Sequence, residues 1–109
     1  MTLTLPSLLA AMVAAQNAHD GDAFLACFAD EAVVRDEGHT HVGTAAIRAW
    51  FDEVTRKYAP HFEVTDLGSW DGEPVLTGMV SGNFGGSPIE LRYYVAMDEG
   101  KIVALKIAA

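Results

Sequence analysis

Asp36 is the first side chain in this sequence whose type and position could do chemistry. If residues 32–36 form a strand, Ala32, Val34 and Asp36 share one face, and Val33 and Arg35 share the other. A carboxylate turned toward an apolar interior is costly unless it is paired or functional. Burial would also raise its pKa toward the range of a general base. Asp36 is therefore either a catalytic base or a structural carboxylate bound to the glycine loop after it or to a nearby cation.

Two histidines follow this carboxylate closely. Asp36, His39 and His41 have donor types that a metal ion accepts, but their spacing is not that of a known metal site, so we predict no metal. Either histidine could transfer protons, or both could lie in a solvated loop. We name His41 as the second candidate catalytic residue and His39 as a candidate ligand contact. His61 is expected at a strand edge.

The candidate ligand-binding side chains lie on one helix and on the strands of the second half. Trp50 and Tyr58 fall on the apolar stripe of a helix, and Met79 and Tyr93 are expected to face it from the sheet. These four side chains either wall a pocket or fill the core. Asn83 lies four residues after Met79, so in a continuous strand the two would share a face. Asn83 either presents its amide to a ligand or forms a turn.

The first half of the chain predicts three helices and one strand. A helix over residues 7–18 begins at start signals from Thr4 to Ser7, which include a hydroxyl cap and a proline. Asp22 is expected to cap a second, short helix, and the strand over residues 32–36 follows. A loop then leads to Thr44, the expected cap of the third helix.

From residue 61 onward the apolar period falls to two, which predicts four strands in an antiparallel meander. Turn signals at residues 71–72, 85–86 and 99–100 divide the strands. Glycines 78, 82 and 85, in or near the third of these segments, suit strong curvature. The side chains expected to face the helices from the next strand are Ile89, Leu91, Tyr93, Val95 and Met97. The outer face is expected to carry Leu76, Val80 and Tyr94 among charges.

Composition narrows the class of protein. The length of 109 residues predicts one packed domain over residues 1–109. The formal charge of -8 disfavours nucleic acid and anionic membranes as partners, because like charges repel. The single Cys27 cannot form an internal disulfide and is expected to be buried and inert. No basic residue precedes Arg35, so we expect no signal peptide and a cytoplasmic protein.

Five segments together resemble a known family. They are residues 17–22, 28–36, 43–51, 82–88 and 98–102. In content and order they are similar to the nuclear transport factor 2-like fold and, within it, to the SnoaL-like group. The resemblance implies an α+β, cone-shaped roll in which three helices pack on a strongly curved, mainly antiparallel sheet. It leaves activity open, because this fold hosts isomerases, epoxide hydrolases, polyketide cyclases and non-catalytic binding modules.

The resemblance also bears on the candidate base. Asp36 occupies a position similar to that of the proton-abstracting aspartate in the ketosteroid isomerase branch. That branch takes an oxyanion-binding tyrosine from its first helix, whereas this chain has no tyrosine before Tyr58. The branch's second donor, an acid on a meander strand, would fall at Glu90, which is expected to point outward. Steroid isomerisation is therefore disfavoured.

Three hypotheses follow. The first is an isomerase, cyclase or hydrolase without a cofactor, in which Asp36 transfers protons on a small apolar organic molecule and His41 or Tyr93 assists. The second is a domain that binds such a molecule without chemistry. The third is an assembly module, since the sheet could pair two copies as a homodimer.

Overall fold

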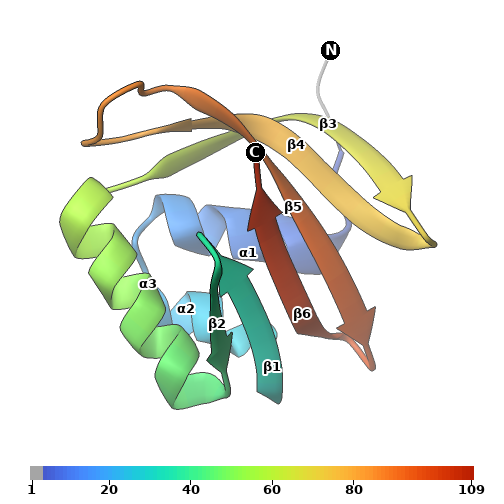
Figure 1. The fold of residues 1–109 in the computed structure, drawn as a ribbon. Coiled ribbons are helices and arrows are strands. Elements are labelled where there is room, and N and C mark those ends of the chain that lie inside the picture. The colour runs from blue at the N-terminus through green and yellow to red at the C-terminus, as the bar shows by residue number, and fades with distance from the viewer. Residues whose placement is uncertain (1–3) are drawn as a thin grey trace.

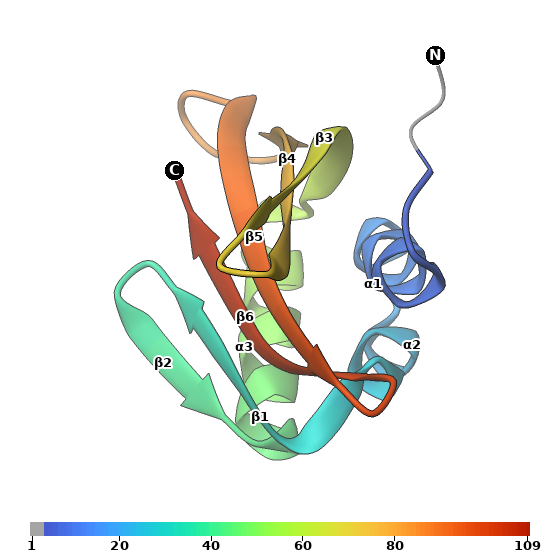
Figure 2. The ribbon, with the colours of Figure 1, turned by 90° about the vertical axis from the view of Figure 1, so that its right-hand side faces the viewer.

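The computed structural model describes residues 4–109, which form the predicted helices and strands in the predicted order, with one additional short strand over residues 39–42. The helices cover one side of a curved sheet, and Figures 1 and 2 give two views at right angles. The elements are α1 (Ser7–Asn17), α2 (Gly21–Ala26), β1 (Phe28–Asp36), β2 (His39–Val42), α3 (Thr44–Tyr58), β3 (His61–Trp70), β4 (Glu73–Ser81), β5 (Ile89–Asp98) and β6 (Lys101–Ala108).

The sheet has six strands in the order β2-β1-β6-β5-β4-β3. β1 and β6 pair in parallel, and every other neighbouring pair is antiparallel. In Figure 2, α1 and α2 lie together on one side of the sheet, and β2 lies at its far edge. This arrangement confirms the predicted α+β class, the curved and mainly antiparallel sheet, and the meander from residue 61.

Three predicted helix caps and one predicted loop are wrong. No side-chain hydrogen bond caps α1, whose N-cap position is Pro6. Asp20 rather than Asp22 caps α2, because its Oδ1 accepts the backbone N–H of Ala23 at 3.1 Å. Gly43 rather than Thr44 stands at the N-cap of α3, and the Thr44 hydroxyl instead donates to the carbonyl of Asp30.

The fourth error concerns the loop expected after the first strand. β1 already begins at Phe28, and residues 39–42 form β2, which pairs with β1. Glu37 and Gly38 make the two-residue turn between them, with φ values of 52° and 77°. Positive φ at both positions is the geometry of a tight hairpin turn, which glycine accepts without strain. Asp36 therefore ends β1 directly opposite His39.

The strand β4 places its side chains on the faces opposite to those predicted. Leu76 pairs with Tyr93 and Val80 with Ile89, and side chains of directly opposed residues share a face of the sheet. Leu76 and Val80 are accordingly buried on the helix side, while Met79 lies opposite Glu90 on the outer side. Apolar residues occupy both odd and even positions of this strand, so alternation alone could not show which face is buried.

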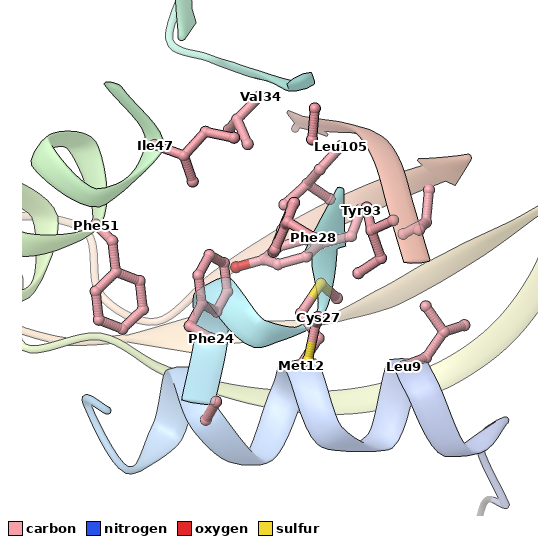
Figure 3. Close-up of a cluster of buried hydrophobic side chains, with 14 of the residues drawn as sticks. Leu9, Met12, Phe24, Cys27, Phe28, Val34, Ile47, Phe51, Tyr93 and Leu105 are labelled. Carbon is pink, nitrogen blue, oxygen red and sulfur yellow. The ribbon is translucent and has the colours of Figure 1, made fainter. Parts of the chain in front are cut away.

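The core lies between the helices and the inner face of the sheet. Figure 3 labels side chains from both layers. Phe24 of α2 packs against Phe51 of α3 with ring centroids 4.5 Å apart. The sheet contributes Phe62, which stacks on Tyr93 at 4.2 Å with an interplanar angle of 9°. Cys27 is buried, as predicted. Stacked and tilted rings of this kind fix one another's position.

The end of α1 is fastened to the start of β3 by one side chain. The amide of Asn17 donates from Nδ2 to the Phe62 carbonyl at 2.9 Å, and its Oδ1 accepts the Phe62 N–H at 2.7 Å. Both backbone groups of Phe62 are thus satisfied by a helix residue. Because Phe62 stacks on Tyr93, this contact also fixes α1 relative to the centre of the sheet.

Candidate functional site

A cavity of about 180 Å³ lies between α1, α2, α3 and the inner face of the sheet. Most of its wall is apolar, with side chains from the helices, β4, β5, β6 and the segment after β4. The main apolar contributors are Phe24, Phe51, Val80, Phe84, Leu91 and Ile107. The polar contributors include Gln16, Asp36, Glu37, Trp50, Tyr58 and Tyr93. None of the described side chains that line this cavity is a lysine, arginine or histidine.

Asp36 reaches the cavity as the alternation of β1 predicts. Ala32 and Val34, on the same face, are 1% and 0% exposed, and Asp36 at the end of the strand is partly buried. Its Oδ2 accepts a hydrogen bond of 3.1 Å from Nε1 of Trp50, one turn into the apolar stripe of α3. The hydrogen bond fixes the carboxylate at the wall and leaves Oδ1 without a side-chain partner among the described residues.

The electrostatics of this wall favour a proton on Asp36 more than water does. Burial is the largest cause and raises the pKa of Asp36 above its ordinary value, and the charge of Glu37 raises it further. The hydrogen bond from Trp50 and the nearby His41 lower the same pKa, but they offset burial only in part. A carboxylate in this setting is a stronger base than one in water.

Gln16 and Tyr93 form a second polar group in the wall. Tyr93 is 3% exposed and Gln16 is 8% exposed, and the two side chains hydrogen-bond to each other. Burial raises the pKa of Tyr93 far above its ordinary value, and the charge of Asp36 raises it too, although the Gln16 hydrogen bond opposes them. Tyr93 therefore carries a neutral hydroxyl, and Tyr93 lines the same cavity as Asp36.

The structure brings together only some of the predicted site residues. Asp36, Trp50, Tyr58 and Tyr93 all line the cavity. Met79 does not, contrary to the expectation, because the register of β4 turns it to the outer face.

Three other candidates lie outside the cavity wall. His39 is exposed, and its Nδ1 donates to the Glu37 carbonyl at 3.1 Å. The ring of His41 lies 6.0 Å from that of Trp50, and its charge acts on Asp36, but His41 does not line the cavity. Asn83 is exposed in the turn region after β4, where its backbone N–H donates to the Tyr58 carbonyl at 2.7 Å. Across residues 4–109, no three side chains of the types that bind metals gather in one place.

Gln16 is the functional candidate that the sequence reasoning missed. It lies four residues after Met12 and seven after Leu9, which is the spacing of the buried face of α1. A polar residue at a core position of a helix is a signal for a buried hydrogen-bonding role. The signal was present, but it needed Tyr93 as a partner, and that partner is 77 residues away.

Comparison with known proteins decides the family. The sequence profile of the SnoaL-like domain matches residues 9–105. The chain belongs to the SnoaL-like family. A solved structure from Sinorhizobium meliloti, provisionally named a polyketide cyclase, is 32% identical to this SnoaL-like chain, with a TM-score of 0.91 over 95% of each chain. A search of curated proteins found no match.

More distant structures share the fold of this SnoaL-like chain. A Catenulispora acidiphila protein with a ketosteroid isomerase-like fold, solved with trimethylamine, gives a TM-score of 0.84 at 18% identity over 97% of this chain and 87% of that one. TerC co-crystallised with polyporic acid gives 0.80 at 13% identity over 93% and 87%. The predicted nuclear transport factor 2-like fold is thereby confirmed. In residues 4–109, none of the helices has the length and apolar character that crossing a bilayer requires.

Proposed function

We propose that this chain binds a small, largely apolar organic molecule and transfers a proton on it with Asp36 as the base, in the manner of an isomerase or cyclase. The observation that carries the proposal is the partly buried carboxylate, oriented by Trp50 at the wall of an apolar cavity. Proton transfer by a positioned side chain is most effective when its pKa approaches the working pH. The raised pKa of Asp36 moves it in that direction.

The cavity sets the size and charge of the ligand. An apolar cavity of ~150 Å³ holds a benzene ring, and this one measures about 180 Å³. With two acidic side chains and no cation on its described wall, it disfavours a carboxylate or phosphate ligand. The structural relatives solved with trimethylamine and polyporic acid support a role for this fold in binding small organic molecules.

The test is exchange of carbon-bound hydrogen in D₂O. A panel of small aryl ketones, led by 4-fluoroacetophenone, supplies acidic C–H groups, and proton NMR follows loss of the methyl signal. We expect Asp36→Asn to slow exchange by roughly 10²-fold or more, because asparagine keeps the shape but cannot accept the proton. Asp30→Asn is the matched control, since Asp30 lies on the same strand and is exposed.

Two outcomes decide between the hypotheses. Equal exchange by the native protein and Asp36→Asn would exclude Asp36 as the base. Saturable binding of the ketones, measured by fluorine NMR, with no exchange in the native protein would favour the alternative of a binding domain without catalysis.

We also propose that two copies associate through the outer face of the sheet. A hollow of about 190 Å³ lies there, with Arg35 and Lys106 on adjacent strands and Asp71 and Glu73 at the β3–β4 turn. Trp70 beside them is 69% exposed. A two-fold axis can place the acids of one copy against the cations of the other, because an isologous interface pairs each patch with its complement. This self-complementary charge pattern favours a homodimer.

A further inference from the structure

Two consecutive carboxylates line the cavity where β1 ends. Asp36 is partly buried and Glu37 is exposed to solvent, so this end of the cavity is its mouth. The charge of Glu37 raises the pKa of the Asp36 carboxyl group, which shows that the two negative charges act on each other. A positive group placed beside them would relieve this repulsion.

Neither carboxylate has an ion-pair partner within residues 4–109. The acids that form ion pairs there are Asp22, Asp52, Glu53 and Glu90. His41 is the basic group whose charge acts on Asp36, and it changes the pKa of Asp36 less than Glu37 does. His41 also does not line the cavity. The described part of the chain therefore leaves the two carboxylates at the mouth without a counter-ion.

The far end of the cavity has a different character. Trp50 binds Asp36 at the acidic end, and Tyr58 lies eight residues further along α3, which is about 12 Å along the helix axis. There the ring of Tyr58 meets that of Phe84 edge-on with centroids 5.8 Å apart, and both residues line the cavity. Nζ of Lys57 lies 5.2 Å from the centroid of the Tyr58 ring, which disfavours a second cation at this end. A ligand that fills the space needs a charged head at the mouth and an apolar body beyond it.

The mouth suits a cation better than a neutral group. An ammonium group there keeps part of its hydration, because Glu37 is open to water, and the carboxylates replace the rest. A methyl group of the same size would displace water from the carboxylates and return no hydrogen bond, which is unfavourable. A carboxylate would be repelled by both acids. The charge of the mouth thus selects among ligands that the apolar interior would accept alike.

We propose that the ligand is a small amine in its ammonium form, about the size of benzylamine, whose N–H groups donate to Glu37 and whose apolar body extends toward Tyr58 and Phe84. The ammonium charge lies beside Asp36, and the hydrogen bond to Glu37 leaves Oδ1 of Asp36 available for the proton transfer proposed above. This inference rests on the proposed function only for the binding of a small organic molecule in this cavity, and it requires no chemical step.

The test compares two ligands that have the same shape and different charge. 4-Fluorobenzylammonium carries NH₃⁺ where 4-fluoroethylbenzene carries CH₃, and fluorine NMR follows the binding of both at neutral pH and low salt. We expect the amine to bind roughly tenfold more tightly, the usual effect of one hydrogen bond to a charged group. We expect 4-fluorobenzoate, an anion of similar size, not to bind. Added salt should weaken binding of the amine but not of the hydrocarbon.

Glu37→Gln removes the charge at the mouth and keeps the length of the side chain. We expect it to weaken binding of the amine roughly three- to fivefold, because Glu37 is exposed and its charge is partly screened, and to leave binding of the hydrocarbon unchanged. Glu31→Gln is the matched control, since Glu31 is an exposed residue of β1 that does not line the cavity. Both variants change the net charge equally, so a difference between them reports on the mouth and not on the whole molecule.

The Asp36 carboxyl group gives a second readout. A cation beside it stabilises the ionised form, so we expect the amine to lower the pKa of Asp36 and the hydrocarbon not to lower it. The protein groups coupled to the Asp36 charge are Trp50 from α3, Glu37, His41 from β2 and Tyr93 from β5. They are the same in both complexes, so the comparison isolates the ligand. Carbon-13 NMR of the carboxyl group measures the titration midpoint.

The outcomes separate this inference from the proposed function. Equal or tighter binding of the hydrocarbon, together with ketone exchange that needs Asp36, would overturn the ammonium site and leave the base in place. Binding of the amine that depends on Glu37 but not on Glu31, without ketone exchange in the native protein, would support the ammonium site and overturn proton transfer by Asp36. Equal losses in Glu37→Gln and Glu31→Gln would mean that the amine responds only to net charge, and that result would overturn the assignment of Glu37.

Discussion

The hydrogen bond from Trp50 to Asp36 lowers the pKa of the Asp36 carboxyl group, so its removal should change that pKa measurably. Because burial raises the pKa of Asp36 in the folded protein, the folded state binds this proton more tightly than the unfolded state. The resulting contribution to stability is present below the unfolded pKa and is lost as the pH rises through the folded one. At neutral pH the site therefore costs stability, as functional carboxylates often do.

Replacing Trp50 with phenylalanine removes the hydrogen bond that lowers this pKa. We expect Trp50→Phe to move the titration midpoint of Asp36 to higher pH, and to move the onset of ketone exchange with it. Carbon-13 NMR of the carboxyl groups measures the midpoint directly. The exposed carboxylates in the same spectra are the internal control, and a midpoint that stays or falls would refute the role of the bond.

How far the sequence predicted the site differs from residue to residue. Strand alternation was enough to place Asp36 toward the interior, because it needs only five neighbouring residues. Asp36 shares a face with Ala32 and Val34, and Arg35 shows that the other face is exposed. Gln16 could not be assigned in this way, since its meaning depends on Tyr93, which the fold brings from far along the chain. Its position on the buried face of α1 was the one available signal.

At the scale of elements, the turn sequences were the local features that best predicted where strands end. Asp71-Gly72 and Glu99-Gly100 join strands with positive φ at both residues, as predicted from an acidic residue followed by glycine. Glu37-Gly38 has the same composition and the same geometry, yet residues 37–43 were expected to form a loop. The short β2, with four residues, was too brief to show a period.

Gly78 is the position in β4 where a side chain cannot be added. A Cβ there would overlap the carbonyl oxygen of Glu63 and lie 2.6 Å from Cε1 of Phe62, on the neighbouring β3 where the register shifts. We expect Gly78→Ala to lower the free energy of unfolding by about 1–3 kcal/mol, the range for overpacking a core. Chemical denaturation monitored by circular dichroism measures this change.

Gly68→Ala is the control for this prediction, because Gly68 also lies in a strand of this sheet and a Cβ there meets nothing closer than 3.7 Å. We expect its effect to be much smaller. Equal losses of stability in the two variants would mean that the cost arises from glycine in a strand generally and not from the close approach of β3.

At the scale of the whole molecule, the two faces of the sheet differ in kind. The inner face carries the apolar core and the cavity, and the outer face carries charges of both signs around an exposed tryptophan. Two such faces were predicted from the sequence, but the residues of β4 were assigned to the wrong ones: Leu76 and Val80 lie on the inner face and Met79 on the outer face. A net charge of -8 leaves repulsion between copies, so association depends on local pairing of opposite charges.

Trp70 is the residue on which the proposed dimer depends. We expect Trp70→Ala to weaken self-association at least roughly tenfold, since exposed tryptophans are frequent hot spots of interfaces. Sedimentation velocity over a range of concentrations measures the dimer, and added salt should also weaken it. Val42→Ala is the control, because Val42 is 59% exposed and does not line the hollow. A native protein that sediments as a monomer would contradict the proposal.

The clamp between Asn17 and Phe62 also affects how this molecule meets others. β3 is the last strand of the sheet, and the N–H and C=O of Phe62 that Asn17 binds are groups that a foreign strand would need for pairing. A helix side chain already occupies them, so an intruding strand finds no free partner at this end. Strand addition, which begins fibril growth, is thereby blocked at the start of β3.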